Sequence, residues 1–339
     1  MTTFTRRLQR IGSSILVSLP KEWVDANKLD KSSQVEIETT QNNLSITTQQ
    51  NKKPTKEVEI PYPLSKEDSV VANITGAYLL GYDLIRIKGK SAISIKDREN
   101  IRASMRSLVA IEIIDEDAKT ITAQFLLDES SVNPQKILKR MSSIAQGMFI
   151  DVFGMDHLTI LRNPGQLRSL ADRDSEINRQ YFLLVRLIRS AIVDKRLAGT
   201  FNLGDMDILD YRLAANIIEN AGDTISNITE TISHSVEIMG KSHFNLICDI
   251  AKDIEEIQTK SVDAFISNDR ALAITTIQLH KKFLKKIHDV RISKTLQESG
   301  VLGFLELLQR IENYEKSWSD ILDLIKPSYK YLNNFFCAA

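Results

Sequence analysis

Residues 209–232 read LDYRLAANIIENAGDTISNITETI, and this stretch carries the two patterns that decide the fold. Apolar residues recur in it at spacings of three and four, which is the period of an amphipathic helix. We expect one buried stripe formed by Leu209, Leu213, Ala214, Ile217, Ala221, Ile225, Ile228 and Ile232. Glu219, Asp223 and Asn227 follow one another at intervals of four, so they form a second row that faces away from the stripe.

This second row indicates a surface that attracts cations. Oxygen donors stacked along a helix repel one another unless a cation lies over them, and hard or borderline metal ions prefer carboxylate ligands. The segment before the helix places Asp174 and Asn178 one turn apart. An antiparallel neighbour would bring that pair beside Glu219 and Asp223 and complete a surface site of four oxygens. The alternative is a solvated polar face that binds nothing.

Helical patterns extend from Ser131 almost to the end of the chain. Asn133 is suited to cap the first helix and Pro134 to its first position. Turn and cap residues separate six predicted helices, at about 134–156, 164–196, 205–239, 242–267, 269–297 and 300–332. Three helices followed by three indicate an internal duplication, with one bundle in residues 131–240 and another in 241–332.

The first fifty residues are of a different kind. Residues 11–19 are a β-prone run that Pro20 ends, residues 21–26 predict a short helix, and residues 35–38 and 44–47 alternate as in a hairpin. A unit of this size cannot enclose much core alone. We therefore expect residues 1–50 to pair with a second copy.

Positive charge is concentrated at the start of this unit. Arg6, Arg7, Arg10 and Lys21 precede any acidic residue, although 44 Lys plus Arg balance 44 Asp plus Glu over the whole chain. Doubled by dimerisation, this basic patch would contact several phosphates of double-stranded DNA. The alternative is that the hairpin unit only dimerises the protein.

A small α/β unit is predicted between the hairpin unit and the helices. The polar, proline-containing segment 49–56 has no periodicity and predicts a linker. In residues 56–130 we expect two helices and four strands, with the helices at 66–80 and 95–108 and the strands at 58–60, 84–87, 111–114 and 120–127. The sequence assigns this unit no chemistry.

Composition bounds the class of protein. The chain has 339 residues, of which 42% are apolar and 26% charged, as in a globular protein of two or three domains. It has no apolar signal core and no run of about 18 apolar residues, so we expect a cytoplasmic protein without membrane insertion. Two distant cysteines, Cys248 and Cys337, speak against a disulfide scaffold. No Gly-rich phosphate loop, nucleophile elbow or zinc-protease motif is present, so an enzyme is not expected.

The acidic segments resemble the paired signatures of the PhoU family of phosphate-signalling proteins. The segments are Asp172-Arg-Asp174-Ser-Glu-Ile-Asn178 and Glu219-Asn-Ala-Gly-Asp223-Thr-Ile-Ser-Asn227-Ile. The resemblance covers about residues 134–330 and implies two three-helix bundles with surface metal clusters. It implies Asp174, Asn178, Glu219, Asp223 and Asn227 as ligands of a divalent or trivalent ion, with iron, zinc, magnesium and calcium all open. In the second half the matching segment reads Gln309-Arg-Ile-Glu312-Asn313, which puts a second cluster in doubt.

The N-terminal segment resembles a second family. Residues 7–23, which read RLQRIGSSILVSLPKEW, look like the AbrB/SpoVT swapped-hairpin module, in which two copies interweave into a DNA-binding dimer. Its fusion to a PhoU-like body is typical of archaea. Together the two resemblances imply a mainly helical, multidomain regulator of phosphate uptake that binds DNA as a dimer.

Two other functions stay open. One is an adaptor that docks on a phosphate-transport ATPase or a signalling partner and uses the hairpin only to dimerise. The other, a carboxylate-bridged metal enzyme, would need inward-pointing Glu with Glu-x-x-His pairs, which the chain lacks.

Overall fold

The structure is a computed structural model that describes residues 3–39, 44–48, 55–63, 68–292 and 301–326. It divides into two compact units, Met1–Thr55 and Lys56–Ala339. We describe each unit by itself.

The first unit consists of two small hairpins and one short helix. Strands β1 (Gln9–Ile11) and β2 (Ser14–Leu16) pair antiparallel, as do β3 (Val35–Thr39) and β4 (Leu44–Thr48), and α1 (Lys21–Ala26) lies between the hairpins in sequence. The prediction of one continuous strand over residues 11–19 was wrong. Gly12, with φ of 62°, turns the chain after Ile11, because glycine enters the left-handed region without steric cost.

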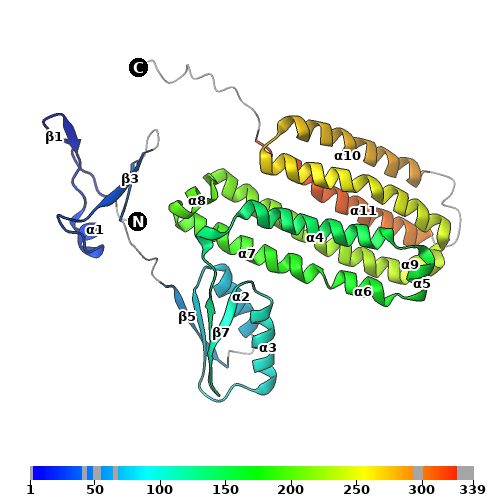
Figure 1. Cartoon of the computed structure of the whole chain (residues 1–339), viewed down its shortest axis with the longest axis horizontal. Helices are drawn as coiled ribbons and strands as arrows, with labels where there is room; N and C mark the ends of the chain where they lie inside the picture. Colours follow the sequence, from blue (N-terminus) through cyan, green and yellow to red (C-terminus); the bar gives the residue numbers. More distant parts are fainter. Residues whose placement is uncertain (1–2, 40–43, 49–54, 64–67, 293–300, 327–339) are drawn as a thin grey trace. The chain divides into compact units, whose positions relative to one another are not determined.

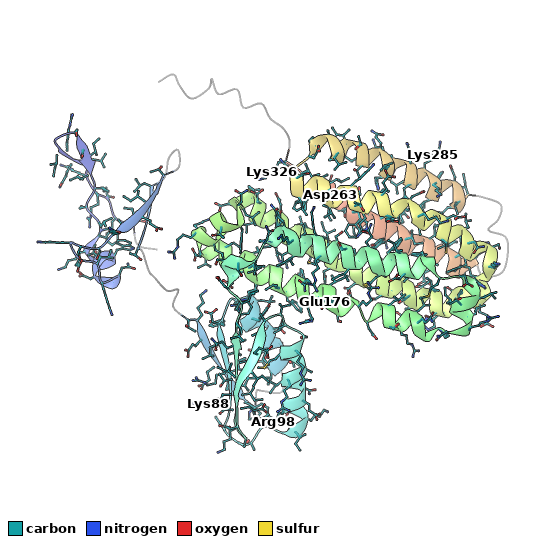
Figure 2. All side chains as sticks on the ribbon, viewed as in Figure 1. Lys88, Arg98, Glu176, Asp263, Lys285 and Lys326 are labelled. Carbon is teal, nitrogen blue, oxygen red and sulfur yellow. The ribbon has the colours of Figure 1, made fainter. Side chains whose placement is uncertain are left out.

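The second unit begins with a four-stranded sheet. Its order is β5 (Glu57–Tyr62), β6 (Leu84–Gly89), β8 (Thr120–Phe125) and β7 (Ile111–Glu116), with β5 and β6 parallel and the other pairs antiparallel. Helices α2 (Val70–Leu79) and α3 (Ile95–Arg106) pack against each other beside the sheet (Figure 1). Arg98 on α3 forms an ion pair with Glu116 on β7 and so ties helix to sheet (Figure 2).

The rest of the second unit is helical, and its helices lie lengthwise beside one another (Figure 1). They are η1 (Glu129–Ser131), α4 (Pro134–Gly154), α5 (His157–Arg162), α6 (Gly165–Ala171), α7 (Asp174–Val193), α8 (Lys195–Phe201), α9 (Asp205–Ser267), α10 (Arg270–Arg291) and α11 (Val301–Leu322). Asn133 caps α4 as predicted, since its side chain accepts a hydrogen bond from the backbone N–H of Lys136. The fold is thus mainly helical with an N-terminal hairpin module and a small α/β region, as the sequence predicted.

The long helix α9 consists of two arms joined at Gly240. This residue has φ of 73° and ψ of 164°, which no helix accommodates. The chain turns back there, and Figure 1 shows the yellow arm returning beside the yellow-green one. His157 contacts both arms, through a 3.0 Å hydrogen bond with the carbonyl oxygen of Val236 and a ring contact with Phe244. The predicted break at Gly240 is therefore confirmed.

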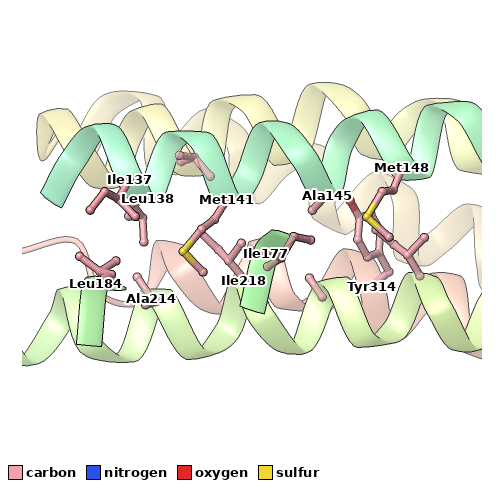
Figure 3. Packing of buried hydrophobic residues seen from close by; sticks show 14 of the residues in the cluster. Ile137, Leu138, Met141, Ala145, Met148, Ile177, Leu184, Ala214, Ile218 and Tyr314 are labelled. Atoms are coloured by element: carbon pink, nitrogen blue, oxygen red, sulfur yellow. The ribbon is translucent and has the colours of Figure 1, made fainter. Parts of the chain in front are cut away.

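One continuous hydrophobic core joins the helices and extends into the α/β region. Side chains from α4, α7, α9 and α11 meet in it, among them Met141, Ile177, Ile218 and Tyr314 (Figure 3). The ring of Tyr314 stacks on Phe149 at 4.3 Å between centroids, which fixes α11 against α4. The acidic row, formed by Glu219, Asp223 and Asn227 on α9, lies on the outer side of a helix that packs into this core.

Two details of the helical prediction were wrong, and a third falls outside the described residues. The predicted helix 164–196 is broken into α6 and α7 at residues 172 and 173, and the short α5 precedes them. The last two predicted helices extend into residues 293–300 and 327–332, which lie outside the described residues. Leu209 and Leu213 are 59% and 46% exposed instead of buried, so none of the described residues covers these side chains fully.

Candidate functional site

The structure brings the two acidic segments together. Asp174 begins α7, and it faces Asp223 and Glu219 on the first arm of α9 closely enough that both charges act on it. Asp223 and Asn227 are exposed, whereas Glu219 and Asp174 are half-buried. The row therefore faces water along most of its length, as its spacing predicted.

Asp174 on α7 lies beside this acidic row, and the negative charges of the row act on its carboxyl group. Burial, followed by the charges of Asp223 and Glu219, raises the pKa of Asp174 to about 6. Its Oδ2 accepts a 3.0 Å hydrogen bond from Asn178, while its buried Oδ1 has no hydrogen-bond partner within the described residues. A carboxylate oxygen in this position gains from a proton or from a cation, since either one removes the repulsion by its neighbours.

The neighbours of Glu219 have opposing effects on its pKa. Burial and the charge of Asp223 raise the pKa of Glu219, and the nearby guanidinium of Arg212 lowers it. Arg212 itself lies over the ring of Tyr181, 5.1 Å from the centroid, so its position is fixed by α7. One end of the acidic row is thereby bordered by a cation.

Gly222 permits the close approach of α7 to α9 at this site. A Cβ atom added there would lie 2.6 Å from Asp174 Oδ1 and 2.8 Å from the Cδ1 of Ile177. A side chain at this position would push Asp174 away from the row. The glycine in the sequence segment 219–227 therefore has a packing function.

The ligand prediction is only partly reflected in the geometry. Asp174, Asn178, Glu219 and Asp223 share one surface, and Asn227 lies one turn beyond Asp223 on the same helix. Within the described ranges, no three side chains of His, Cys, Asp or Glu converge as ligands of a metal ion. The donors suit a cation chemically, but the assignment of all five as ligands remains a prediction.

In the second half of the helical body, an arginine occupies the surface around the segment 309–313. Arg291 on α10 donates hydrogen bonds of 2.7 Å to Gln309 and 2.6 Å to Glu312 on α11. Gln309 in turn donates to Asn313 at 3.1 Å. The guanidinium of Arg291 neutralises the carboxylate of Glu312, as a metal ion would at an acidic row. This arrangement agrees with the doubt about a second metal cluster.

Sequence reasoning missed the buried Arg186 on α7. This side chain is fully buried and joins the helices to the α/β region through four hydrogen bonds, to Glu129, Asp83 and the carbonyl oxygens of Tyr78 and Tyr82. Its guanidinium also lies 3.7 Å from the centroid of the Phe125 ring. A single charged residue within the apolar run 183–188 was the available signal, since an isolated charge in such a run must find partners.

The basic residues predicted for DNA binding are all accessible. Arg6, Arg7, Arg10 and Lys21 are exposed. Arg6 lies over the ring of Phe4, and Arg10 donates to the carbonyl oxygen of Gly12, so neither is paired with an acidic group in the part of the unit that is described. The patch remains available to an anionic partner.

No described helix combines the length and apolar character needed to cross a membrane. No curated protein sequence matches the chain.

Two solved structures are similar to part of this chain. PhoU from Pseudomonas aeruginosa aligns with 57% of this chain and 93% of its own length, at 15% identity and a TM-score of 0.43. The phosphate transport system regulatory protein PhoU from Streptococcus pneumoniae aligns with 56% and 92%, at 14% identity and a TM-score of 0.40.

The N-terminal unit matches a known sequence family. Residues 8–54 match the family described as antidote-toxin recognition MazE, bacterial antitoxin. This segment coincides with the two hairpins and α1. The N-terminal domain is therefore of the MazE/AbrB type, as its sequence predicted.

Proposed function

We propose that this protein is a regulator that binds double-stranded DNA as a dimer through its N-terminal unit. The observation that carries the proposal is that, among the residues between 3 and 48 whose side chains are described, none is buried. Apolar side chains in this unit lie open to water, with Leu8, Ile11 and Ile15 exposed by 71%, 64% and 67%. Such a unit needs a partner to remove these side chains from water, and a second copy offers the matching surface.

The charge of the same unit supports DNA as the ligand. Two copies would present eight cations from Arg6, Arg7, Arg10 and Lys21 and no acidic residue among them. Phosphate contacts by Lys and Arg release counterions, so the logarithm of the binding constant falls by about 0.9 per contact for each logarithmic unit of salt. Eight contacts would give a slope of about −7.

A salt titration of the full-length protein tests this proposal. The probe is a labelled 40-base-pair duplex pool of mixed sequence, titrated between 50 and 300 mM KCl. The triple variant Arg6→Ala, Arg7→Ala, Arg10→Ala should lose most of the salt dependence, by about one unit of slope per lost contact. The control variant Lys281→Ala, Lys282→Ala, Lys285→Ala changes exposed cations on α10 and should bind like the original protein. Of these three residues, Lys285 is labelled in Figure 2.

The proposal would be refuted if both triple variants bound DNA equally. Unaltered dimerisation of the arginine variant, with no DNA binding by any form, would favour the adaptor function instead. In that case the hairpin unit serves only to dimerise a body that docks on a transport ATPase or a signalling protein.

For the helical body we propose a cation-dependent response to phosphate status. The support is the resemblance of the segments 172–178 and 219–227 to PhoU signatures, together with the unpartnered Oδ1 of Asp174 beside two further carboxylates. A bound ion would draw Asp174, Glu219 and Asp223 together as its ligands, and Asn178 and Asn227 would border it. A bound multivalent ion would supply the positive charge by which phosphate could be recognised.

Metal analysis of the purified protein tests this part separately. Asp223→Asn should lower the metal content measured by mass spectrometry, whereas Asp289→Asn, an exposed change on α10, should not. Equal metal content in both variants would contradict the assignment.

A further inference from the structure

The helical body has an open groove that neither proposal uses. It lies between the C-terminal half of α7 and the first turns of α9, with a volume of about 350 Å³. Ile188 and Ile208 form its buried floor, and Ile192 and Leu209, 57% and 59% exposed, form its walls. The apolar surface continues past the groove along α9, where Met206 and Leu213 are 62% and 46% exposed.

This apolar surface has helical spacing. Met206, Leu209 and Leu213 recur at three and four residues on α9, and Ile188 and Ile192 recur at four on α7. Side chains spaced in this way form ridges, and the furrow between two packed helices accepts the ridge of a third. On α9 the row from Met206 to Leu213 rises about 10 Å, which corresponds to two turns of a docked helix.

Two arginines determine which charge an occupant of the groove should carry. Arg189 and Arg212 line it, and neither forms an ion pair within the described residues. Arg189 makes only a long 3.4 Å hydrogen bond to the carbonyl oxygen of Leu79, and Arg212 lies over Tyr181 within electrostatic range of Glu219. The other cation of the groove, Lys195, is already paired with Asp205. The net charge offered to an occupant is therefore positive.

We propose that this groove binds an amphipathic helix of a partner protein that presents apolar side chains between acidic ones. The apolar residues would cover the walls around Ile192 and Leu209, and the carboxylates would pair with Arg189 and Arg212. A second copy of this surface would bring arginines against arginines, so self-association through the groove is disfavoured. The groove lies on the helical body, so this proposal does not rest on DNA binding by the N-terminal unit.

Charge reversal on the full-length protein provides the test. The acidic probe is a labelled synthetic helix of 16 residues with Leu at positions i, i+3, i+4 and i+7 and Glu at its flanks. The basic probe carries Lys in place of each Glu. The protein should prefer the acidic probe by at least tenfold in fluorescence anisotropy, and the double variant Arg189→Glu, Arg212→Glu should invert this preference.

A second variant keeps the test valid if the charge reversal impairs folding. Leu209→Asn changes a mostly exposed wall residue and should weaken binding of the acidic probe at least tenfold while the circular dichroism melt stays unchanged. Matched controls are Leu302→Asn on α11, where Leu302 is 85% exposed, and Lys285→Glu on α10. Both controls should bind within twofold of the original protein.

Three results would overturn the proposal. The first is equal binding of the two probes, or a preference that the charge reversal does not invert. The second is concentration-dependent self-association that Leu209→Asn abolishes, which would make the groove an interface between copies. The third is binding to vesicles of phosphatidylcholine and phosphatidylglycerol that Leu209→Asn abolishes, in a protein that binds neither probe.

Discussion

Replacing Arg186 by Met should weaken the packing of the α/β region against the helices. The substitution keeps much of the apolar stem but removes the guanidinium that donates to Glu129, Asp83 and two backbone carbonyls. Glu129 is buried, so its carboxylate would lose a charged partner in an environment that water does not reach. The 3.0 Å hydrogen bond from Ser190 to Glu129 would remain, but it carries no positive charge.

The expected loss of unfolding free energy can be estimated from other proteins in which one partner of a buried ion pair was removed. Removal of one partner costs about 3–5 kcal/mol because the other charge stays buried. We expect about 4 kcal/mol here, since the pair with Glu129 is deeply buried and the pair with Asp83, whose side chain is 23% exposed, is only partly so. In a unit of this size each kcal/mol shifts the melting temperature by about 2 °C, so a decrease of about 8 °C should follow.

Tryptophan fluorescence during urea unfolding can measure this loss. Trp318 is fully buried in α11 and reports on the helical body once Trp23 is replaced by Phe. Hydrogen exchange of β6 and β8 should report on the α/β region in the same samples. Arg168→Met, an exposed change on α6, is the control and should cost less than about 0.5 kcal/mol.

Two further variants distinguish a buried charge from a general packing defect. Arg186→Lys keeps a charge but lacks the planar fork, so it should lose part of the stability. Glu129→Gln in the Arg186→Met background removes the charge that has lost its guanidinium partner and should recover part of the stability. The reasoning is refuted if Arg186→Met unfolds at the same urea concentration as Arg168→Met.

Three other perturbations test the acidic row and its surroundings. Asp174→Asn in the presence of EDTA should stabilise the protein by about 1 kcal/mol at pH 8 and should give no gain at pH 4. The value at pH 8 is smaller than the full pKa shift of Asp174 would give, because this carboxyl is only half-buried. The sign follows from a folded pKa of about 6 above the unfolded value of 3.8, so that stability falls as pH rises through this window. Gly222→Ala should cost about 1–3 kcal/mol in urea unfolding because its Cβ would overlap Asp174 and Ile177, whereas Gly199→Ala, with open space around it, should be neutral or stabilising. Glu315→Gln should flatten the decline of stability above pH 6.5. The Glu315 carboxylate is hydrogen-bonded to His280 at 2.7 Å and raises the pKa of that imidazole, so stability is lost as the folded His280 deprotonates. An unchanged slope of stability against pH between pH 6.5 and 9 would contradict this.

The sequence by itself determined the local structure of this protein. Helix ends such as Asn133 with Pro134, and the break at Gly240, depend on capping and backbone conformations that act within a few residues. The placement of Asp174 beside Asp223 was also predictable, because each segment has helical spacing and consecutive helices pack antiparallel.

Only the tertiary structure decided what covers each surface. Leu209 and Leu213 have the same periodicity as Ile225 and Ile228, yet the first pair is exposed and the second is buried. Periodicity identifies which residues share a face, but burial depends on whether another element packs over that face. The same holds for Arg186, whose partners Tyr78 and Glu129 are distant in sequence and come together only through the packing of α7 against the α/β region.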